Sequence, residues 1–172
     1  PDYSLNNWLL EANLSGGAVL DLHVHDVDYA VYVFGKPQSI FAQGYPSDGA
    51  GINRVYASWN YDHGTVVHIE GYWDMPTSFG FNMGFTAVFE QAAINWDFNS
   101  GKPLTIFRPG SDPETPELAG DDGYFSEIAY FLSCVEQNKD PQTTTPQQSR
   151  DAVMLALSEV KSIRTGKLVR VK

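Results

Sequence analysis

Several side chains that can bind metals or move protons lie close together near the N-terminus. The stretch GGAVLDLHVHDVDYAVYVFGKP, residues 16–37, contains Asp21, His23, His25 and Asp26. On a strand, the pattern D-x-H-x-H is typical of metal-dependent hydrolases, which bind an ion through such residues. On a helix, the same residues can form a carboxylate–imidazole pair for acid–base chemistry. The chemistry therefore depends on which backbone this stretch adopts.

The apolar residues around these side chains have the spacing of a helix. They follow one another at intervals of four, three, four and three residues, which places them on one helical face: Leu20, Val24, Val27, Val31 and Phe34. Ser15 is a suitable N-cap, and Gly35 followed by Pro37 is a typical helix end. The pattern predicts a helix over residues 16–34.

A helix changes how the two histidines can be used. Each residue advances by roughly 100° around a helix, so His23 and His25 lie roughly 200° apart and cannot bind one ion. Asp21 and His25 are four residues apart and share a face. The four histidines and single cysteine of the chain also form no cluster with metal-ligand spacing. We therefore expect an Asp21–His25 pair and no metal. A hydrolase with metal on His23 and His25 is the alternative, which elemental analysis of the purified protein would test.

The rest of the chain predicts a single α+β domain over residues 1–172. Six strands are expected between residues 39 and 108, at 39–45, 53–61, 65–73, 79–90, 93–98 and 104–108. Helices are expected over residues 123–139 and 146–165, followed by a short strand in KLVRVK. The links between the strands are short, which favours antiparallel pairing. This order predicts an open, mostly antiparallel sheet with helices packed on one face.

Composition and charge narrow the possible partners. The formal net charge is -10, from 21 acidic and 11 basic residues, which disfavours nucleic acid and anionic membranes as partners. No apolar run approaches the roughly 18 residues of a membrane helix. The single Cys134 fits a reducing compartment, so we expect a cytoplasmic location.

Three segments together resemble one enzyme family. The segment SGGAVLDLHVHDVDYAVYVFGKP is similar to the pattern G-G-x-x-x-D-x-x-x-H-D-x-D, ended by G-x-P, of the glucose–fructose oxidoreductase and inositol dehydrogenase (Gfo/Idh/MocA) family. The helices and closing strand from YFSEIAYF to KLVRV resemble the end of that family's domain, and GYWDMP with VFEQAAINWDF resembles its central sheet. The resemblance covers the family's C-terminal domain only. His23 departs from it, because the family usually has a small residue there.

The resemblance implies a function and a set of site residues. Family members transfer a hydride between NAD or NADP and a secondary alcohol, or the matching ketone, of a sugar, cyclitol or related polyol. Carried over to this chain, the catalytic residues are Asp21 and His25, and Asn6 and Trp8 are expected to contact substrate. The cofactor is bound mainly by an N-terminal domain with G-x-G-x-x-G, which is missing here and which also supplies a catalytic lysine. This chain alone is expected to be inactive.

A second class of function follows from an apolar strand pattern. In FGFNMGFTAVF, every second residue from Phe79 to Phe89 is apolar, which predicts a long strand with one face in need of cover. The resemblance implies a homo-oligomer formed through the open sheet. The alternative to an enzyme is therefore a stand-alone binding or oligomerisation module without catalysis.

Overall fold

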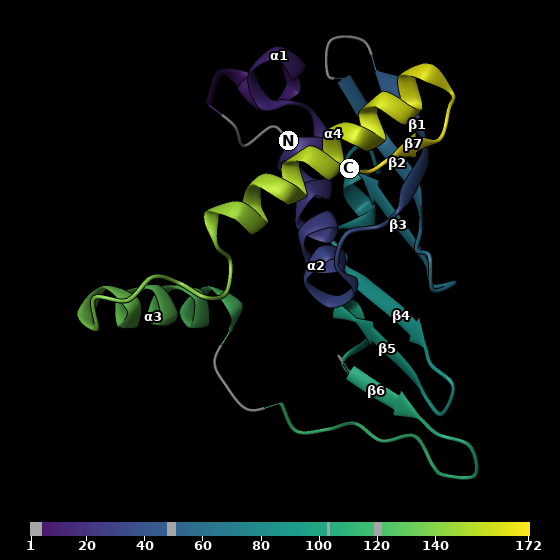
Figure 1. Cartoon of the computed structure of the whole chain (residues 1–172), viewed down its shortest axis with the longest axis vertical. Helices are drawn as coiled ribbons and strands as arrows, with labels where there is room; N and C mark the ends of the chain where they lie inside the picture. Colours follow the sequence, from purple (N-terminus) through teal and green to yellow (C-terminus); the bar gives the residue numbers. More distant parts are fainter. Residues whose placement is uncertain (1–4, 48–50, 103, 119–121) are drawn as a thin grey trace. The chain divides into compact units, whose positions relative to one another are not determined.

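The computed structural model describes residues 5–47, 51–102, 104–118 and 122–172. They form two compact units, drawn in Figure 1. The first unit consists of Pro1–Met75 together with Pro141–Lys172, and the second of Pro76–Asp140. Each unit has its own antiparallel sheet. The candidate residues of the sequence analysis all lie in the first unit.

The first unit combines a four-stranded sheet with helices from both ends of the chain. Its N-terminal helical segments are a 3₁₀ helix η1 (Leu5–Leu10), α1 (Ala12–Ser15), a π-helical turn η2 (Val19–His23) and α2 (Val24–Phe34). The strands are β1 (Ser39–Ser47), β2 (Gly51–Asn60), β3 (Val66–Tyr72) and β7 (Val169–Arg170), and the long helix is α4 (Pro146–Thr165). The strand order is β3-β2-β1-β7, with every pair antiparallel.

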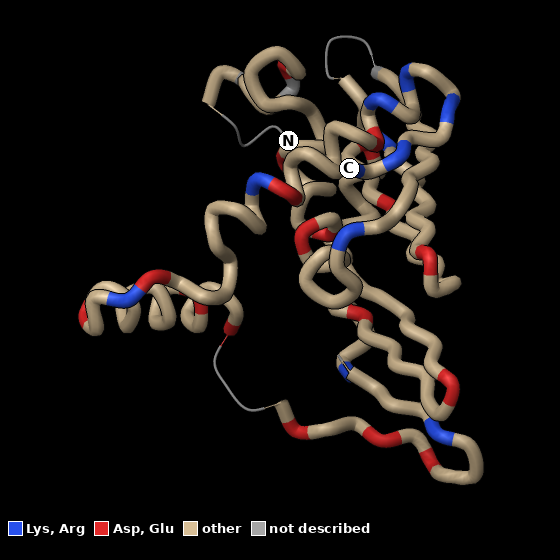
Figure 2. The backbone as a smooth tube through the Cα atoms, viewed as in Figure 1, with Lys and Arg blue, Asp and Glu red and all other residues tan. Residues whose placement is uncertain are grey.

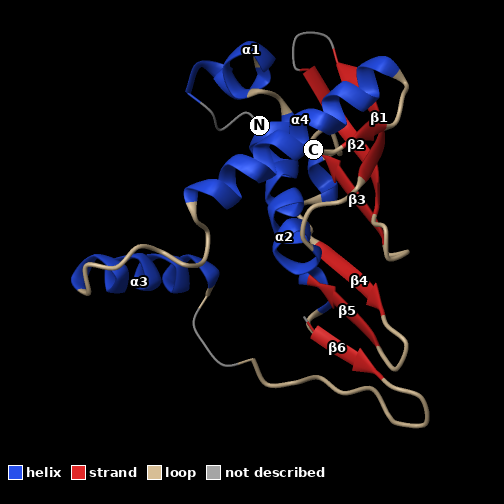
Figure 3. Ribbon diagram, in the orientation of Figure 1, coloured by secondary structure: helices blue, strands red, loops and turns tan. Residues whose placement is uncertain are grey.

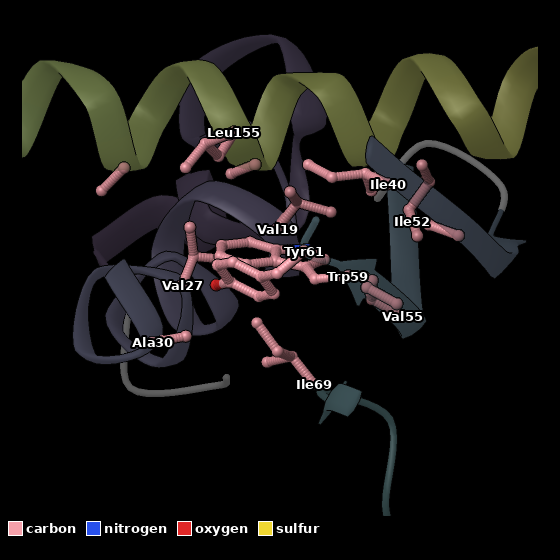
Figure 4. Close-up of a cluster of buried hydrophobic side chains, with 14 residues drawn as sticks. Val19, Val27, Ala30, Ile40, Ile52, Val55, Trp59, Tyr61, Ile69 and Leu155 are labelled. Atoms are coloured by element: carbon pink, nitrogen blue, oxygen red, sulfur yellow. The ribbon is translucent and has the colours of Figure 1, made fainter. Parts of the chain in front are cut away.

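Helices α2 and α4 cover one face of this sheet and contact each other (Figure 1). The strands alternate accordingly: Ile40 and Trp59, opposite each other in β1 and β2, are fully buried, whereas Phe41 and Tyr56 are exposed. In Figure 4, Leu155 points from α4 into the cluster of buried side chains that includes Trp59. Burying apolar surface in this way stabilises the fold by roughly 25 cal/mol for each Å² removed from water.

Local signals in the sequence explain the limits of α4. Thr145 and Gln148 form a reciprocal capping box at its start, and Pro146 occupies the first helical position, where its missing N–H costs nothing. Gly166 ends the helix in the left-handed conformation, with φ of 63°. These features confirm the predicted helix over residues 146–165.

The second unit holds the remaining strands and one helix, coloured red and blue in Figure 3. Its sheet has the order β4-β5-β6, made of β4 (Gly84–Val88), β5 (Ala93–Asp97) and β6 (Leu104–Phe107). Two 3₁₀ turns, η3 (Thr77–Phe79) and η4 (Phe98–Ser100), precede β4 and follow β5, and α3 spans Gly123–Glu136. Figure 2 shows several acidic residues along the segment between β6 and α3.

The predicted class, an α+β fold with open antiparallel pairing and helices on one sheet face, is confirmed. Two details of the prediction were wrong. The strand expected at residues 79–90 is limited to β4, because η3 occupies its start and residues 80–83 form no strand. The helix expected at residues 16–34 begins only at Val19, and Ser15 does not cap it. Instead, the hydroxyl of Ser15 donates to Leu9 O and accepts from Gly17 N.

Candidate active site

Two consecutive glycines lead the chain into the helix that carries the candidate residues. Gly16 and Gly17 have φ of 78° and 70°, a backbone conformation that L side chains rarely adopt. A Cβ atom on Gly16 would also lie 2.6 Å from Cδ1 of Leu20. The next residues, Ala18 and Val19, are buried and hold the start of η2 in the core. The GG pair of the sequence is therefore required by the turn into this helix.

Asp21 and His25 lie on either side of a change in helical geometry. Asp21 is half-buried in η2, and His25 is exposed at the second residue of α2. A π-helical turn is wider than an α-helical one, so a spacing of four residues does not align side chains across it as it would in α2. In the part of the chain that the structure describes, the two side chains form no hydrogen bond with each other. Their pairing stays a prediction.

His25 lines a shallow cavity between α2 and the start of α4. The cavity has a volume of about 220 Å³ and is lined by polar and aromatic side chains: His25, Asp28, Tyr29, Val31, Tyr32, Thr143, Thr144 and Gln148. Small-molecule sites usually measure roughly 300–1,000 Å³. This cavity can therefore accept one polar part of a ligand, or form one wall of a larger site.

The cavity contains a carboxylate that the sequence analysis did not single out. Asp28 lies three residues after His25, and this spacing places both on one face of α2. The spacing of three residues from His25 is the sequence signal that could have identified Asp28. Asp21 does not line the cavity. On one helix face, the imidazole of His25 can receive a proton, and the carboxylate of Asp28 can accept hydrogen bonds from hydroxyl groups.

His23 is directed away from the cavity and into the core. Its side chain is fully buried, and its Nε2 lies 2.6 Å from Oε2 of Glu159 in α4. His23 and His25 thus differ in both burial and direction. Among the described residues, no group of three His, Cys, Asp or Glu side chains is placed to hold a metal ion.

The pKa of Asp26 depends on its burial and on three charged or titratable neighbours. Removal of its carboxyl from water raises its pKa above the ordinary value of 3.8, and the nearby Glu159 raises it further. His23 and His25 act in the opposite direction and lower the pKa of Asp26. The pKa of Asp26 is therefore raised overall, because removal from water outweighs the effect of the two imidazoles.

Asn6 and Trp8 lie in η1, and both are exposed. Asn6 has φ of 55°, an uncommon conformation for a residue other than glycine. Neither residue lines the cavity around His25. Their expected contact with substrate stays a prediction.

The described residues contain no parallel βαβ unit. Dinucleotides bind to a parallel βαβ unit with a glycine-rich first turn. All strand pairs in the described parts of both units are antiparallel. No helix in the described residues is long and apolar enough to span a bilayer.

Comparison with known proteins identifies relatives of the whole chain. The profile of the GFO/IDH/MocA C-terminal domain matches residues 1–101. A D-xylose 1-dehydrogenase (NADP(+)) from Haloferax volcanii is 24% identical over 164 residues, which cover 93% of this chain and 50% of that protein. The chain thus spans about half the length of this curated relative.

Solved structures share the fold at low sequence identity. Levoglucosan dehydrogenase in complex with NADH superposes with a TM-score of 0.82 and 15% identity, over 100% of this chain and 54% of that one. Aldose-aldose oxidoreductase from Caulobacter crescentus, complexed with glycerol, gives a TM-score of 0.81 and 13% identity, over 96% and 51%. The architecture is therefore that of the second half of these enzymes.

Proposed function

Because the chain belongs to the Gfo/Idh/MocA family, we propose that it is the substrate-binding domain of an NAD(P)-dependent oxidoreductase. The substrate class is a secondary alcohol, or the matching ketone, of a sugar or related polyol. The observation that carries the proposal is the exposure of His25 in a polar cavity, next to the carboxylate of Asp28. Sugar dehydrogenases among the relatives support the substrate class.

The role of His25 follows from the electron and proton balance of the reaction. An alcohol carbon that becomes a ketone loses a hydride to the oxidised nicotinamide, and its hydroxyl group loses a proton. An imidazole can accept this proton near neutral pH. His25 is the exposed imidazole of the cavity and takes this role.

The carboxylates on either side of His25 have supporting roles. Asp28 lines the cavity and accepts hydrogen bonds from other hydroxyl groups of the polyol. Asp21, in the π-helical turn before His25, favours the protonated imidazole through its negative charge, without a hydrogen bond to the ring. Asn6 and Trp8 contribute to substrate binding from η1.

The cofactor and a catalytic lysine belong to a dinucleotide-binding domain outside the described residues. The sheets formed by the described residues are antiparallel and offer no parallel βαβ unit for the cofactor. The isolated chain is therefore inactive, and its own contribution is to bind the polyol and accept its proton.

The test is a pair of histidine substitutions in the complete protein that contains this chain. Oxidation of D-xylose, levoglucosan and myo-inositol is followed with NAD and with NADP. His25→Ala should lower kcat by about 10²- to 10⁴-fold, the usual contribution of a general base. His63→Ala is the matched control, because His63 is exposed and lies outside the cavity. Equal activity of the two variants would refute the role of His25.

Assembly is a second candidate function, favoured by exposed apolar side chains in the second unit. They include residues with about half or more of their surface exposed: Phe79, Phe81, Val88 and Phe89. Several large apolar side chains exposed in one small unit are typical of a surface that a partner covers. We propose that a second copy of the chain covers it. Sedimentation equilibrium tests this, since a purely monomeric protein would contradict it.

A further inference from the structure

The carboxylate of Glu159 joins three elements inside the first unit. Its Oε2 lies 2.6 Å from Nε2 of His23 in η2, and its Oε1 accepts a 2.7 Å hydrogen bond from the indole N–H of Trp59 in β2. All three side chains are fully buried. The last residue of η2 is thus tied to α4 and, through it, to β2. We call these three residues the buried clamp.

The buried clamp is not the arrangement that would give the greatest stability. Burying a carboxylate and an imidazole costs free energy, and apolar residues of similar volume are often as stable or more so. In addition, Nδ1 of His23 is buried and has no hydrogen-bond partner among the described residues. Stability alone therefore does not account for polar groups at this position, and the unpartnered Nδ1 calls for an explanation.

The ring of His23 is also confined by its neighbours. It packs against Gly71 in β3, where an added Cβ atom would lie only 3.0 Å from Nδ1 and 3.4 Å from Cβ of His23. Gly71 has an ordinary φ, so this close approach, and not the backbone conformation, accounts for the absence of a side chain. The contact with Gly71 and the bond to Glu159 together hold the His23 ring in its position.

A fixed His23 determines how Asp21 and His25 are oriented relative to each other. His23 is the last residue of η2 and lies two residues from each of them. If η2 changed into α-helix, the residues before His23 would rotate around the helix axis by up to roughly 100°, the angle of one residue. Asp21, inside η2, would rotate with them, whereas His25 in α2 would stay in place. The buried clamp opposes this change.

We propose that His23, acting through Glu159 and Trp59, is a positioning residue that holds the π-helical turn and so sets the orientation of Asp21 relative to His25. The inference rests on the proposed function, in which these two residues act on the polyol.

The experiment compares three variants of the complete protein. His23→Leu removes the bond to Glu159. His23→Gln keeps an amide N–H donor close to the position of Nε2. Ser162→Ala is the matched control, because Ser162 is also fully buried in α4 and its hydrogen-bond partners, Ala42 N and Lys167 O, lie outside η2.

Two readouts separate positioning from stability. His23→Leu should lower kcat for D-xylose or levoglucosan by about 10- to 100-fold with little change in KM, as expected for misplaced catalytic groups. His23→Gln should restore most of this loss, and Ser162→Ala should lower the thermal midpoint without lowering kcat. Amide hydrogen exchange at residues 19–25 should accelerate in His23→Leu and not in Ser162→Ala.

Each outcome supports or overturns the proposal. An unchanged kcat in folded His23→Leu, while His25→Ala is inactive, would overturn the positioning role and leave the proposed function intact. If no polyol is oxidised by the unmodified protein, the proposed function fails, and hydrogen exchange then decides the role of the clamp alone. Unchanged exchange at residues 19–25 would overturn it.

Discussion

The indole N–H of Trp59 donates to the carboxylate of Glu159 over 2.7 Å, and neither side chain is exposed to solvent. Trp59→Phe should therefore leave one buried carboxylate oxygen without a partner. We expect the free energy of unfolding to fall by about 1–3 kcal/mol for the lost hydrogen bond, and further for the lost volume. Urea unfolding measures this. Trp73→Phe is the control, because Trp73 is only partly buried; equal losses in both variants would contradict the prediction.

Asp28 should contribute to substrate binding through its place in the cavity. Asp28→Asn keeps the shape of the side chain and removes its charge. Because a hydrogen bond to a charged group contributes about 1.5–3 kcal/mol, kcat/KM for a polyol should fall about tenfold or more. Asp62→Asn, in an exposed turn outside the cavity, should leave kcat/KM unchanged. A similar fall in both variants would mean that Asp28 has no special role.

The ion pair between Lys36 and Asp151 should make stability depend on pH. Their Nζ and Oδ2 atoms lie 2.7 Å apart, and the bond to Lys36, followed by that to Gln147, lowers the pKa of Asp151 below its ordinary value of 3.8. The folded state therefore holds this proton less tightly than the unfolded state. The stabilisation is complete above pH 3.8 and is lost as the pH falls through the lower, folded-state pKa.

Lys36→Met removes the cation and tests this dependence. The thermal midpoint should decrease at pH 7, and the difference from the unmodified protein should shrink toward zero as the pH approaches 2. Lys161→Met, on the exposed side of α4, should show no such pH-dependent difference. A deficit for Lys36→Met that is equally large at pH 7 and pH 2 would exclude the ion pair as its cause.

Gly71→Ala should destabilise the protein by forcing His23 away from β3. The added methyl group would lie 3.0 Å from Nδ1, so the ring must shift by a few tenths of an ångström and strain its bond to Glu159. Overpacking of a core typically costs about 1–3 kcal/mol. Gly123→Ala is the control, because a Cβ there meets no atom within 4 Å. Chemical denaturation measures the stability of both variants. Equal denaturation midpoints for Gly71→Ala and Gly123→Ala would contradict the prediction.

The fold was predictable from the sequence where helix-capping residues and the spacing of apolar residues indicated the same element. The capping box of Thr145 and Gln148 and the Pro146 that follows mark the start of α4 in the sequence, and the predicted helix over residues 146–165 is confirmed. The start of the N-terminal helix was harder to locate, because the hydrophobic spacing of four and three residues tolerates a π-helical turn. No local signal distinguished η2 from α-helix.

The candidate site was predicted in part. His25 lines the polar cavity, as its type and exposure allow, and Asp28 could have been found from its spacing of three residues. Glu159 could not have been found in this way. It meets His23 across 136 positions of sequence, and its neighbours in α4 give it the appearance of an ordinary surface charge. Only tertiary packing brings it into the core.

The first unit is assembled from the two ends of the chain, with the second unit inserted between β3 and α4. During synthesis, the N-terminal sheet and α2 leave the ribosome well before α4, whose Ala152, Leu155 and Ala156 complete their core. Until α4 arrives, the face of the sheet that it will cover is open to water, and His23 has no carboxylate partner. Helix α2 is therefore made early but held in place late. Contacts this distant in sequence slow folding, and an uncovered sheet face is prone to aggregation in that interval.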